Sequence, residues 1–257
     1  MIITIDMGNS HTEIGGFEGE TLVFAERIRT DLDRTAMEYG VLIHNIFEML
    51  DIDSAIVTGG ILSSVVPQLT ETICRGVKKA LGITPLVVGP GVKNGLKIAI
   101  DDPKQLGADM VVSAVGAIHA YGKPLIVIDM GTATTLAAID DKGVFLGGLI
   151  LSGMRTATNA LSSGASQLPY ISFTAPARVI GTNTIDSMKS GAVYGQAAQL
   201  DGLIDRIETE MGQNTTVVAT GGLSGLVVPH CKRKDIIFDR ELMLRGLRII
   251  YEMNRKK

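Results

Sequence analysis

The stretch IITIDMGNSHTEIGGF, residues 2–17, places an apolar run directly before Asp-Met-Gly and a series of hydroxyl side chains. The stretch LIVIDMGTATTLAAI, residues 125–139, repeats this arrangement, with Asp129 in the position of Asp6. After each copy come a polar turn and a third apolar stretch, at 21–28 and at 144–150. Short apolar segments joined by polar turns predict two β-meanders, each with Asp, Gly and hydroxyls in its first turn.

A second pair of similar stretches supports an internal duplication. SAIVTGGILSSVVP at 54–67 returns as TVVATGGLSGLVVP at 216–229, with Thr-Gly-Gly and Val-Val-Pro at the same offsets from Thr58 and Thr220. Thr58 and Thr220 lie further apart along the chain than the two aspartates do, so this alignment predicts an insertion in the second half. We therefore expect an α/β protein of two similar domains, residues 1–120 and 121–257, with the last helix packing back on the first domain.

Apolar residues at spacings of three and four predict the helices between these strands. Gly82 is the expected stop of the second helix, because glycine adopts the backbone conformation that ends helices. The predicted helices span 34–50, 66–82, 103–122, 183–212 and 240–257.

Composition narrows the class of protein. The 257 residues are 46% hydrophobic, and the net charge of −3 offers no basic stripe to nucleic acid. The apolar runs are too short to span a membrane, and the chain enters a strand at once, without a signal peptide. Cys74 and Cys231 form no pair of closely spaced ligands and are expected to be reduced thiols. We expect a cytoplasmic protein that binds neither nucleic acid nor membrane.

The two Asp-Gly turns have the composition of phosphate-binding loops. Such loops need backbone N–H groups, small residues and hydroxyls, which 8–12 and 131–135 supply. Asp6 and Asp129 would repel phosphate unless a cation lay between them, so they indicate a metal ion. The alternative is that each Asp caps its turn, and His11 is either a phosphate contact or a solvated loop residue. The chain lacks the GxxxxGK[ST] and GxGxxG patterns.

Two phosphate turns in duplicated meanders resemble the actin-like ATPase superfamily, which implies two actin-like (ribonuclease H-like) domains with a nucleotide cleft between them. The resemblance sharpens to the type III pantothenate kinases, because six motifs occur in the order of that family. These are DMGNSHT, GPGVKNGLKI, LGADM, DMGTATT, NTIDSMKSG and VVATGGL, and the resemblance runs from Ile2 to about Asn254.

The resemblance implies ATP and Mg²⁺ as cofactors and assigns nucleotide contacts. Asp6 would lie near Mg²⁺, and Asp129 would hold a monovalent cation, K⁺ or NH₄⁺. Thr132 would contact ATP, and Gly221 and Gly222 would let the adenine lie against backbone. The first turn would bind the ATP phosphates through Asp6, Met7, Gly8, Asn9, Ser10, His11, Thr12 and Glu13.

The resemblance also implies the acceptor and the reaction. The acceptor would be pantothenate, phosphorylated to 4′-phosphopantothenate in the first step of coenzyme A biosynthesis, by a homodimer. Gly107, Ala108 and Asp109 match the substrate segment, in which Asp109 would be the general base. Thr184 would be a further substrate contact. Residue chemistry alone favours the alternative that Asp109 is a helix-initial carboxylate stabilised by the helix dipole, and only the resemblance reverses this preference.

Four positions depart from the family pattern. Met110 stands where the family usually has Arg, and Ile100 where it commonly has Tyr. Ser113 and Asn94 replace a common Asn and a common Thr or Ser. A thioether in place of a guanidinium removes charge-assisted hydrogen bonds, so the nucleotide half of the predicted site is intact and the acceptor half, including Ile100 and Met110, is altered.

These departures leave two alternatives. One is a kinase of another small hydroxy compound, which a more apolar acceptor pocket would favour. The other is a non-catalytic ATP-binding or regulatory relative, in which Asp109 would have no role in turnover. A mechanical ATPase is disfavoured, because 257 residues leave little room for additional subdomains.

Overall fold

The computed structural model describes residues 1–255, and the chain forms two compact units. The first unit comprises 1–96, 102–116 and the described residues from Glu241 on, and the second comprises 97–101 and 117–240. The chain therefore passes between the units four times. The actin-like domain limits at 1–120 and 121–257 stay a prediction, and residues 256–257 of the last predicted helix lie outside the described part.

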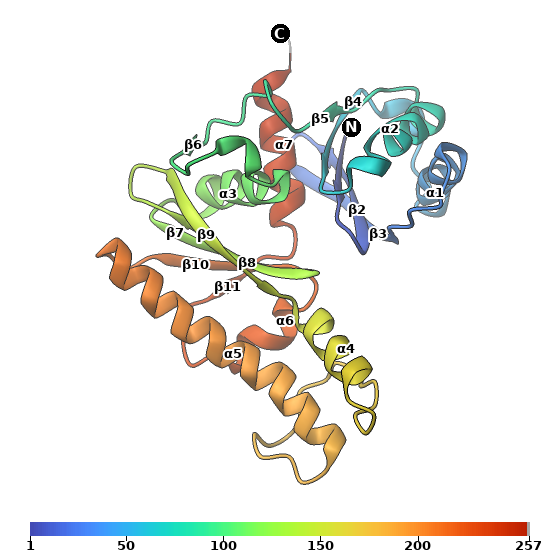
Figure 1. Ribbon diagram of the computed structural model, residues 1–257. Coiled ribbons are helices and arrows are strands. Elements are labelled where there is room, and N and C mark those ends of the chain that lie inside the picture. Colours follow the sequence, from blue (N-terminus) through green and yellow to red (C-terminus); the bar gives the residue numbers. More distant parts are fainter. Residues whose placement is uncertain (256–257) are drawn as a thin grey trace. The chain divides into compact units, whose positions relative to one another are not determined.

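The first unit contains a five-stranded sheet in the order β3-β2-β1-β4-β5 (Figure 1). The pairs β1–β2 and β2–β3 are antiparallel, as a meander requires, whereas β4 and β5 continue the sheet in parallel. The first predicted meander is therefore confirmed. Its strands and the two that follow are β1 (Ile2–Met7), β2 (His11–Glu18), β3 (Thr21–Arg29), β4 (Gly59–Ser64) and β5 (Leu86–Val87).

The sheet of the second unit repeats this order as β9-β8-β7-β10-β11 and adds β6 beside β9. The pairs β7–β8 and β8–β9 are antiparallel, and β7–β10 and β10–β11 are parallel, which confirms the second meander and the internal duplication. The strands are β6 (Lys97–Ile98), β7 (Leu125–Met130), β8 (Ala133–Ile139), β9 (Val144–Ser152), β10 (Thr216–Thr220) and β11 (Ile237–Phe238).

Helices cover both faces of the first sheet. On one face, α1 (Ala36–Met49) and α2 (Pro67–Leu81) bury Ile43 and Ile73 against the alternate residues Ile3, Ile5 and Met7 of β1. On the other face, α3 (Ala108–Tyr121) and α7 (Leu242–Asn254) pack against Ile61 of β4. Burial of these side chains stabilises each layer by roughly 25 cal/mol per Å² of apolar surface.

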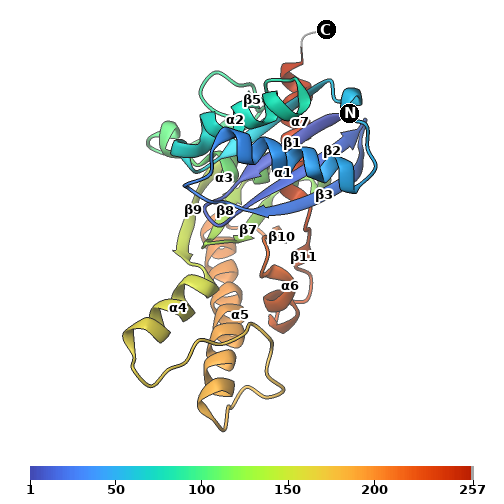
Figure 2. The same cartoon turned by 90° about the vertical axis from the view of Figure 1, so that its right-hand side faces the viewer.

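The core of the second unit lies under one long helix. α5 (Thr184–Met211) buries Val193, Leu200 and Ile204 against Ile126 and Ile128 of β7. The short α6 (Ser224–Val227) joins the same core. Figure 2 shows α4 (Met154–Gly164) and the loop after it beside the first half of α5. Short 3-10 turns complete the described elements at Ser54–Ile56, Pro103–Gln105 and Val228–His230.

The five predicted helices correspond to α1, α2, α3, α5 and α7, with shorter ends, whereas α4 and the short α6 were not predicted. Thr35 begins α1 with a capping box formed with Glu38, and Gly82 ends α2 as predicted. The third predicted helix begins later, because residues 103–105 form a separate 3-10 turn before α3. Among residues 1–255, no helix is long and apolar enough to cross a membrane.

The predicted alignment of Thr58 with Thr220 is wrong. In the parallel ladders Asp6 pairs with Ser63, and Asp129 pairs with Thr220, so Ser63 rather than Thr58 is the structural counterpart of Thr220. The insertion in the second half is real, but it is shorter than that alignment predicts. It corresponds to α4 and the loop between α4 and α5, which have no counterpart between β3 and α1.

Candidate functional site

The two Asp-Gly turns have the same closing hydrogen bond. In the first turn the Gly8 N–H donates to the His11 carbonyl at 3.0 Å, and in the second the Gly131 N–H donates to the Ala133 carbonyl at 3.0 Å. The first turn is one residue longer, because Met7 pairs with Thr12 whereas Met130 pairs with Thr134. Since each glycine N–H is used inside its turn, a phosphate would have to be bound by the residues that follow.

Several predicted nucleotide contacts in the first turn have structural roles. Met7 is buried in the core, and the Thr12 hydroxyl lies 2.9 Å from the Thr30 hydroxyl. The Thr30 hydroxyl in turn donates to the Gly8 carbonyl at 2.8 Å, which stabilises the conformation of the turn. Glu13 faces Arg27 at 3.7 Å. Thr30 was missed from the sequence, because nothing in its neighbourhood there indicates a contact with residue 8.

The remaining residues of the first turn lie at the surface. Asn9, Ser10 and His11 are exposed, and Asp6 is half-buried at the end of β1. Because Asp6 is followed directly by the turn, its carboxylate and the exposed residues share one end of the sheet. This end of the first unit is the part that can meet a charged ligand.

In the second unit, Asp129 lies directly against Gly221. A Cβ at position 221 would come within 2.5 Å of the Asp129 Oδ1 and 2.6 Å of the Met130 nitrogen. Gly221 also has a φ of +93°, which L side chains rarely adopt. The structure therefore brings together two predicted site residues, since β7 and β10 are neighbours and Asp129 pairs with Thr220. Thr132 follows in the turn, where its carbonyl accepts from the Thr156 hydroxyl at 2.8 Å.

Asp109 lies in the first turn of α3, the position that the helix-initial interpretation predicts. It is half-buried, and burial raises the pKa of its carboxyl above the ordinary value of 3.8, although the Met110 N–H donates to it at 2.8 Å. Gly107 is close enough that a Cβ there would collide with the Asp109 Oδ1. The Asp109 carboxyl group thus lies against Gly107 and has a raised proton affinity.

The residues that depart from the family pattern lie in different environments. Met110 is half-buried directly after Asp109, and Ser113 is buried with its hydroxyl donating to the Met110 carbonyl. Asn94 accepts from the Leu96 N–H within its loop. Ile100 is half-buried and belongs to the other compact unit from Met110. Met110 directly follows Asp109 in α3, and Ser113 lies one helical turn further along.

Thr184, the further predicted substrate contact, lies at a cavity of about 710 Å³ in the second unit. Asn183 caps α5 here by accepting from the Asp186 N–H at 2.9 Å. The lining comes from α4, the following loop and the first half of α5, with Met154, Leu161, Leu168 and Met188 among its apolar members. The cavity therefore lies between the insertion in the second half of the chain and the first half of α5.

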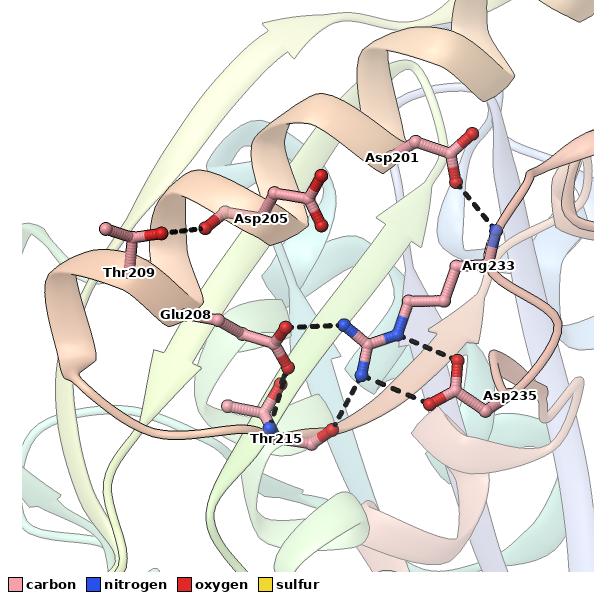
Figure 3. Close-up of polar contacts among 7 residues, drawn as sticks. All are labelled: Asp201, Asp205, Glu208, Thr209, Thr215, Arg233 and Asp235. Carbon is pink, nitrogen blue, oxygen red and sulfur yellow. Dashed lines mark hydrogen bonds and ion pairs between the residues drawn. The ribbon is translucent and has the colours of Figure 1, made fainter.

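An ion-pair network holds the strand that ends before Gly221 (Figure 3). Arg233 donates to Glu208 at 2.6 Å and to Asp235 at 2.8 Å, and it also donates to the Thr215 carbonyl at 3.2 Å. Glu208 accepts from the Thr215 N–H at 2.7 Å. One guanidinium thus ties the end of α5, the start of β10 and the loop before β11.

A preformed metal cage is not among the features of residues 1–255, where no three His, Cys, Asp or Glu side chains gather in a suitable group. Mg²⁺ often binds through one or two carboxylates together with phosphate oxygens and water. A single strand-end carboxylate such as Asp6 or Asp129 fits that mode.

The two sheets of equal strand order define the class of protein as an actin-like, sugar-kinase-type α/β fold. The inorganic polyphosphate/ATP-glucomannokinase of Arthrobacter sp. strain KM has a similar structure, with a TM-score of 0.53, 13% identity and 99% of both chains covered. At this identity the likeness concerns the fold alone.

The particular family follows from sequence comparison. The family model described as type III pantothenate kinase matches residues 2–206. The type III pantothenate kinase of Moorella thermoacetica is 43% identical over 254 residues, covering 99% of this chain and 100% of the relative. That of Exiguobacterium sp. is 43% identical over 256 residues, covering 100% of both. The chain belongs to the type III pantothenate kinase family.

Proposed function

We propose that this chain transfers the γ-phosphoryl group of ATP to the primary hydroxyl of pantothenate and forms 4′-phosphopantothenate for coenzyme A biosynthesis. The observation that carries this proposal is Asp109, a carboxyl group of raised pKa at the start of α3 in a chain of this family. Phosphoryl transfer depends mainly on positioning and charge neutralisation, with a modest contribution from a base.

Asp109 acts in this proposal as the general base. Its carboxylate accepts the proton of the acceptor hydroxyl as that oxygen attacks phosphorus. Burial raises the proton affinity of the carboxylate, which makes it a stronger base than an exposed Asp. Gly107 leaves the space that the Asp109 Oδ1 occupies, so a larger residue there would displace the base.

Mg²⁺ and a monovalent cation accompany ATP in this proposal. The bound cations neutralise phosphate charge during transfer. Asp6 faces the Mg²⁺ at the end of β1, while Asn9, Ser10 and His11 contact phosphate from the exposed turn. Asp129 holds K⁺ or NH₄⁺, and the absence of a Cβ at Gly221 lets the Asp129 carboxylate keep its position against that residue. Thr132, Gly221 and Gly222 contact the nucleotide.

The active form in this proposal is a cytoplasmic homodimer. The loop before α5 and the start of α5 expose Val179, Ile180 and Ile185 close to the 710 Å³ cavity that contains Thr184. Covering this surface with a second copy would bury apolar side chains and place Thr184 in a closed pocket. The free thiols Cys74 and Cys231 suit a reducing compartment.

The experiment that tests the proposal measures ADP release with ATP, Mg²⁺ and K⁺, with and without pantothenate. We expect release that depends on pantothenate and falls by about 10²–10⁴-fold in Asp109→Asn, the usual contribution of a general base. Binding of ATP should persist in that variant. Pantothenate-independent ADP release, or equal rates for both proteins, would refute the assignment.

A second acceptor is favoured by one observation, that the residue directly after Asp109 is Met110, an uncharged thioether. It offers no charge to a carboxylate, so a small hydroxy compound without an acid group would suit this position. The discriminating variant is Met110→Arg. If pantothenate is the natural acceptor and merely binds weakly, this variant should lower its KM about 10-fold, the effect of one charge-assisted hydrogen bond. An unchanged KM would favour the other acceptor.

A further inference from the structure

Ser63 has a buried hydroxyl that the fold does not use. The residue is 0% exposed, and its Oγ has no hydrogen-bond partner in the described part of the chain. Ser64, its neighbour, is bonded internally, since it accepts from the Val66 N–H at 3.2 Å and from the Thr70 hydroxyl at 2.9 Å. Burying an unpaired hydroxyl costs free energy that an alanine would not. The cost suggests a use for the hydroxyl outside the stability of the fold.

The sheet register places Ser63 beside Asp6. The two residues are partners in the parallel ladder between β1 and β4. Partners in such a ladder have their side chains on the same face, on strands about 4.8 Å apart. Ile61, two residues before Ser63, packs against Val112 of α3 and Leu247 of α7. The Asp6 and Ser63 side chains therefore share the face that α3 and α7 cover, opposite the face of α1 and α2.

The second unit repeats this pair independently. Thr220 is the ladder partner of Asp129, and it is 1% exposed. The residues around the hydroxyl side chain differ between the two units, since β4 ends in Leu-Ser-Ser and β10 ends in Val-Ala-Thr. A buried hydroxyl residue thus stands beside the strand-end aspartate in both halves of the molecule. Packing alone would accept alanine or valine at either position.

We propose that Ser63 is a positioning residue for Asp6. This proposal rests on the proposed function, in which Asp6 lies near Mg²⁺. The Ser63 hydroxyl donates a hydrogen bond to one oxygen of the Asp6 carboxylate when Mg·ATP binds, and this bond aims the other carboxylate oxygen at the hydrated cation. Hydrogen bonds to a carboxylate that faces a metal ion orient it, and their loss typically weakens metal affinity 10–100-fold. Ser63 touches neither the acceptor nor the transferred group.

The test compares Ser63→Ala with Ser63→Thr and with Ser64→Ala as the matched neighbour. Affinity for Mg·ATP is measured by titration calorimetry, and affinity for ATP is measured again with excess chelator. Ser63→Ala should bind Mg·ATP about 10–100-fold more weakly and metal-free ATP as well as the native chain does. Its unfolding midpoint without nucleotide should be unchanged or higher, because an unpaired buried group is removed.

The controls separate positioning from a structural role. Ser63→Thr keeps a hydroxyl, as the second unit does at Thr220, and should retain Mg·ATP affinity. Ser64→Ala should lower the unfolding midpoint, since it removes hydrogen bonds at the start of α2, and should leave Mg·ATP affinity unchanged. A purely structural Ser63 would show the reverse pattern, with a lower midpoint and native affinity.

A double-mutant cycle shows whether Ser63 acts through Asp6. In an Asp6→Asn background, adding Ser63→Ala should change Mg·ATP affinity less than about two-fold, because the carboxylate to be oriented is gone. Additive losses, native Mg·ATP affinity in Ser63→Ala, or an equal loss with metal-free ATP would overturn the proposal. Because acceptor turnover is not measured, a failure of the pantothenate assignment is detected separately.

Discussion

At the scale of single residues, the raised pKa of Asp109 has a consequence for stability as well as for the proposed catalysis. Its folded-state pKa is raised by burial above the ordinary 3.8. A group with a raised folded pKa stabilises the fold below its unfolded pKa and loses that contribution as pH rises through the folded pKa. Asp109→Asn should therefore raise the unfolding midpoint, more at about pH 8 than at about pH 5, by the same linkage.

This prediction is checked by thermal unfolding of the native chain and the variant at both pH values. Asp141→Asn is the matched control, because Asp141 is an exposed turn residue. The control should change the midpoint little at either pH. A destabilised Asp109→Asn at the higher pH would mean that the carboxylate makes favourable contacts that outweigh its burial.

The position of Asp6 and Asp129 at the ends of strands was predictable from the sequence, whereas the contacts around them were not. Asp6 and Asp129 follow apolar strands, and that local pattern indicates strand-end carboxylates. Thr30 donates a hydrogen bond to Gly8, and Ser63 pairs with Asp6 in the sheet. Both contacts join residues that are far apart in the sequence, so they form only in the folded chain. The local sequence around these residues carries no signal for such long-range contacts.

At the scale of elements, Arg233 joins the end of α5 to β10 and to the loop before β11. The side chains of Arg233 and Glu208 are only 19% and 13% exposed. Burial alone would raise the pKa of Glu208, but hydrogen bonds from Arg233 and Thr215 lower it below 4.5. Arg233→Met should cost about 3 kcal/mol of unfolding free energy, because it leaves a largely buried carboxylate unpaired.

Denaturant unfolding at neutral pH measures this effect. Arg75→Met is the control, since Arg75 and Glu71 are 67% and 76% exposed and such pairs contribute under about 1 kcal/mol. The pKa of Glu208 is lowered, so its contribution is present above 4.5 and is lost as pH falls through the folded pKa. Equal losses in the two variants would show that the network adds no more than a surface pair.

The error in aligning β4 with β10 has a physical cause. Both strands are buried, so neither shows the alternation of apolar and polar residues that fixes register. An alignment based on the shared Thr-Gly-Gly sequence therefore matches Thr58, directly before β4, with Thr220 at the end of β10. Strand pairing instead matches Ser63 with Thr220. The helices α2 and α6 each begin four residues after these positions, at Pro67 and Ser224.

At the scale of the molecule, the proposed homodimer predicts a specific mutational effect. Ile180 is 82% exposed in the loop before α5. Ile180→Asp should convert a dimer to a monomer in sedimentation experiments at micromolar concentration, since a buried charge without a partner is strongly unfavourable. Met49→Asp, at a residue 86% exposed on α1, is the control and should remain dimeric. A monomeric native chain would contradict the proposal.

The duplicated architecture was predictable because two unlike signals recur in the same order along the chain. The strand order of both sheets, β3-β2-β1-β4-β5 and its counterpart, agrees with that expectation. The added β6 and the assignment of residues 97–101 to the second unit were not predictable, because β6 is only two residues long. The packing of α7 in the first unit, against Ile61, agrees with the expectation that the last helix packs back on the first domain.

The passage of the chain between its two units has a consequence for biosynthesis. The apolar layer formed by Ile61, Val112 and Leu247 includes α7, which ends at Asn254. A ribosome therefore releases the first sheet long before the helix that covers one of its faces. During translation that face is covered by α3 but not by α7 until residues 242–254 have emerged, so a chain truncated before α7 would expose part of an apolar layer and become a substrate for chaperones and proteases.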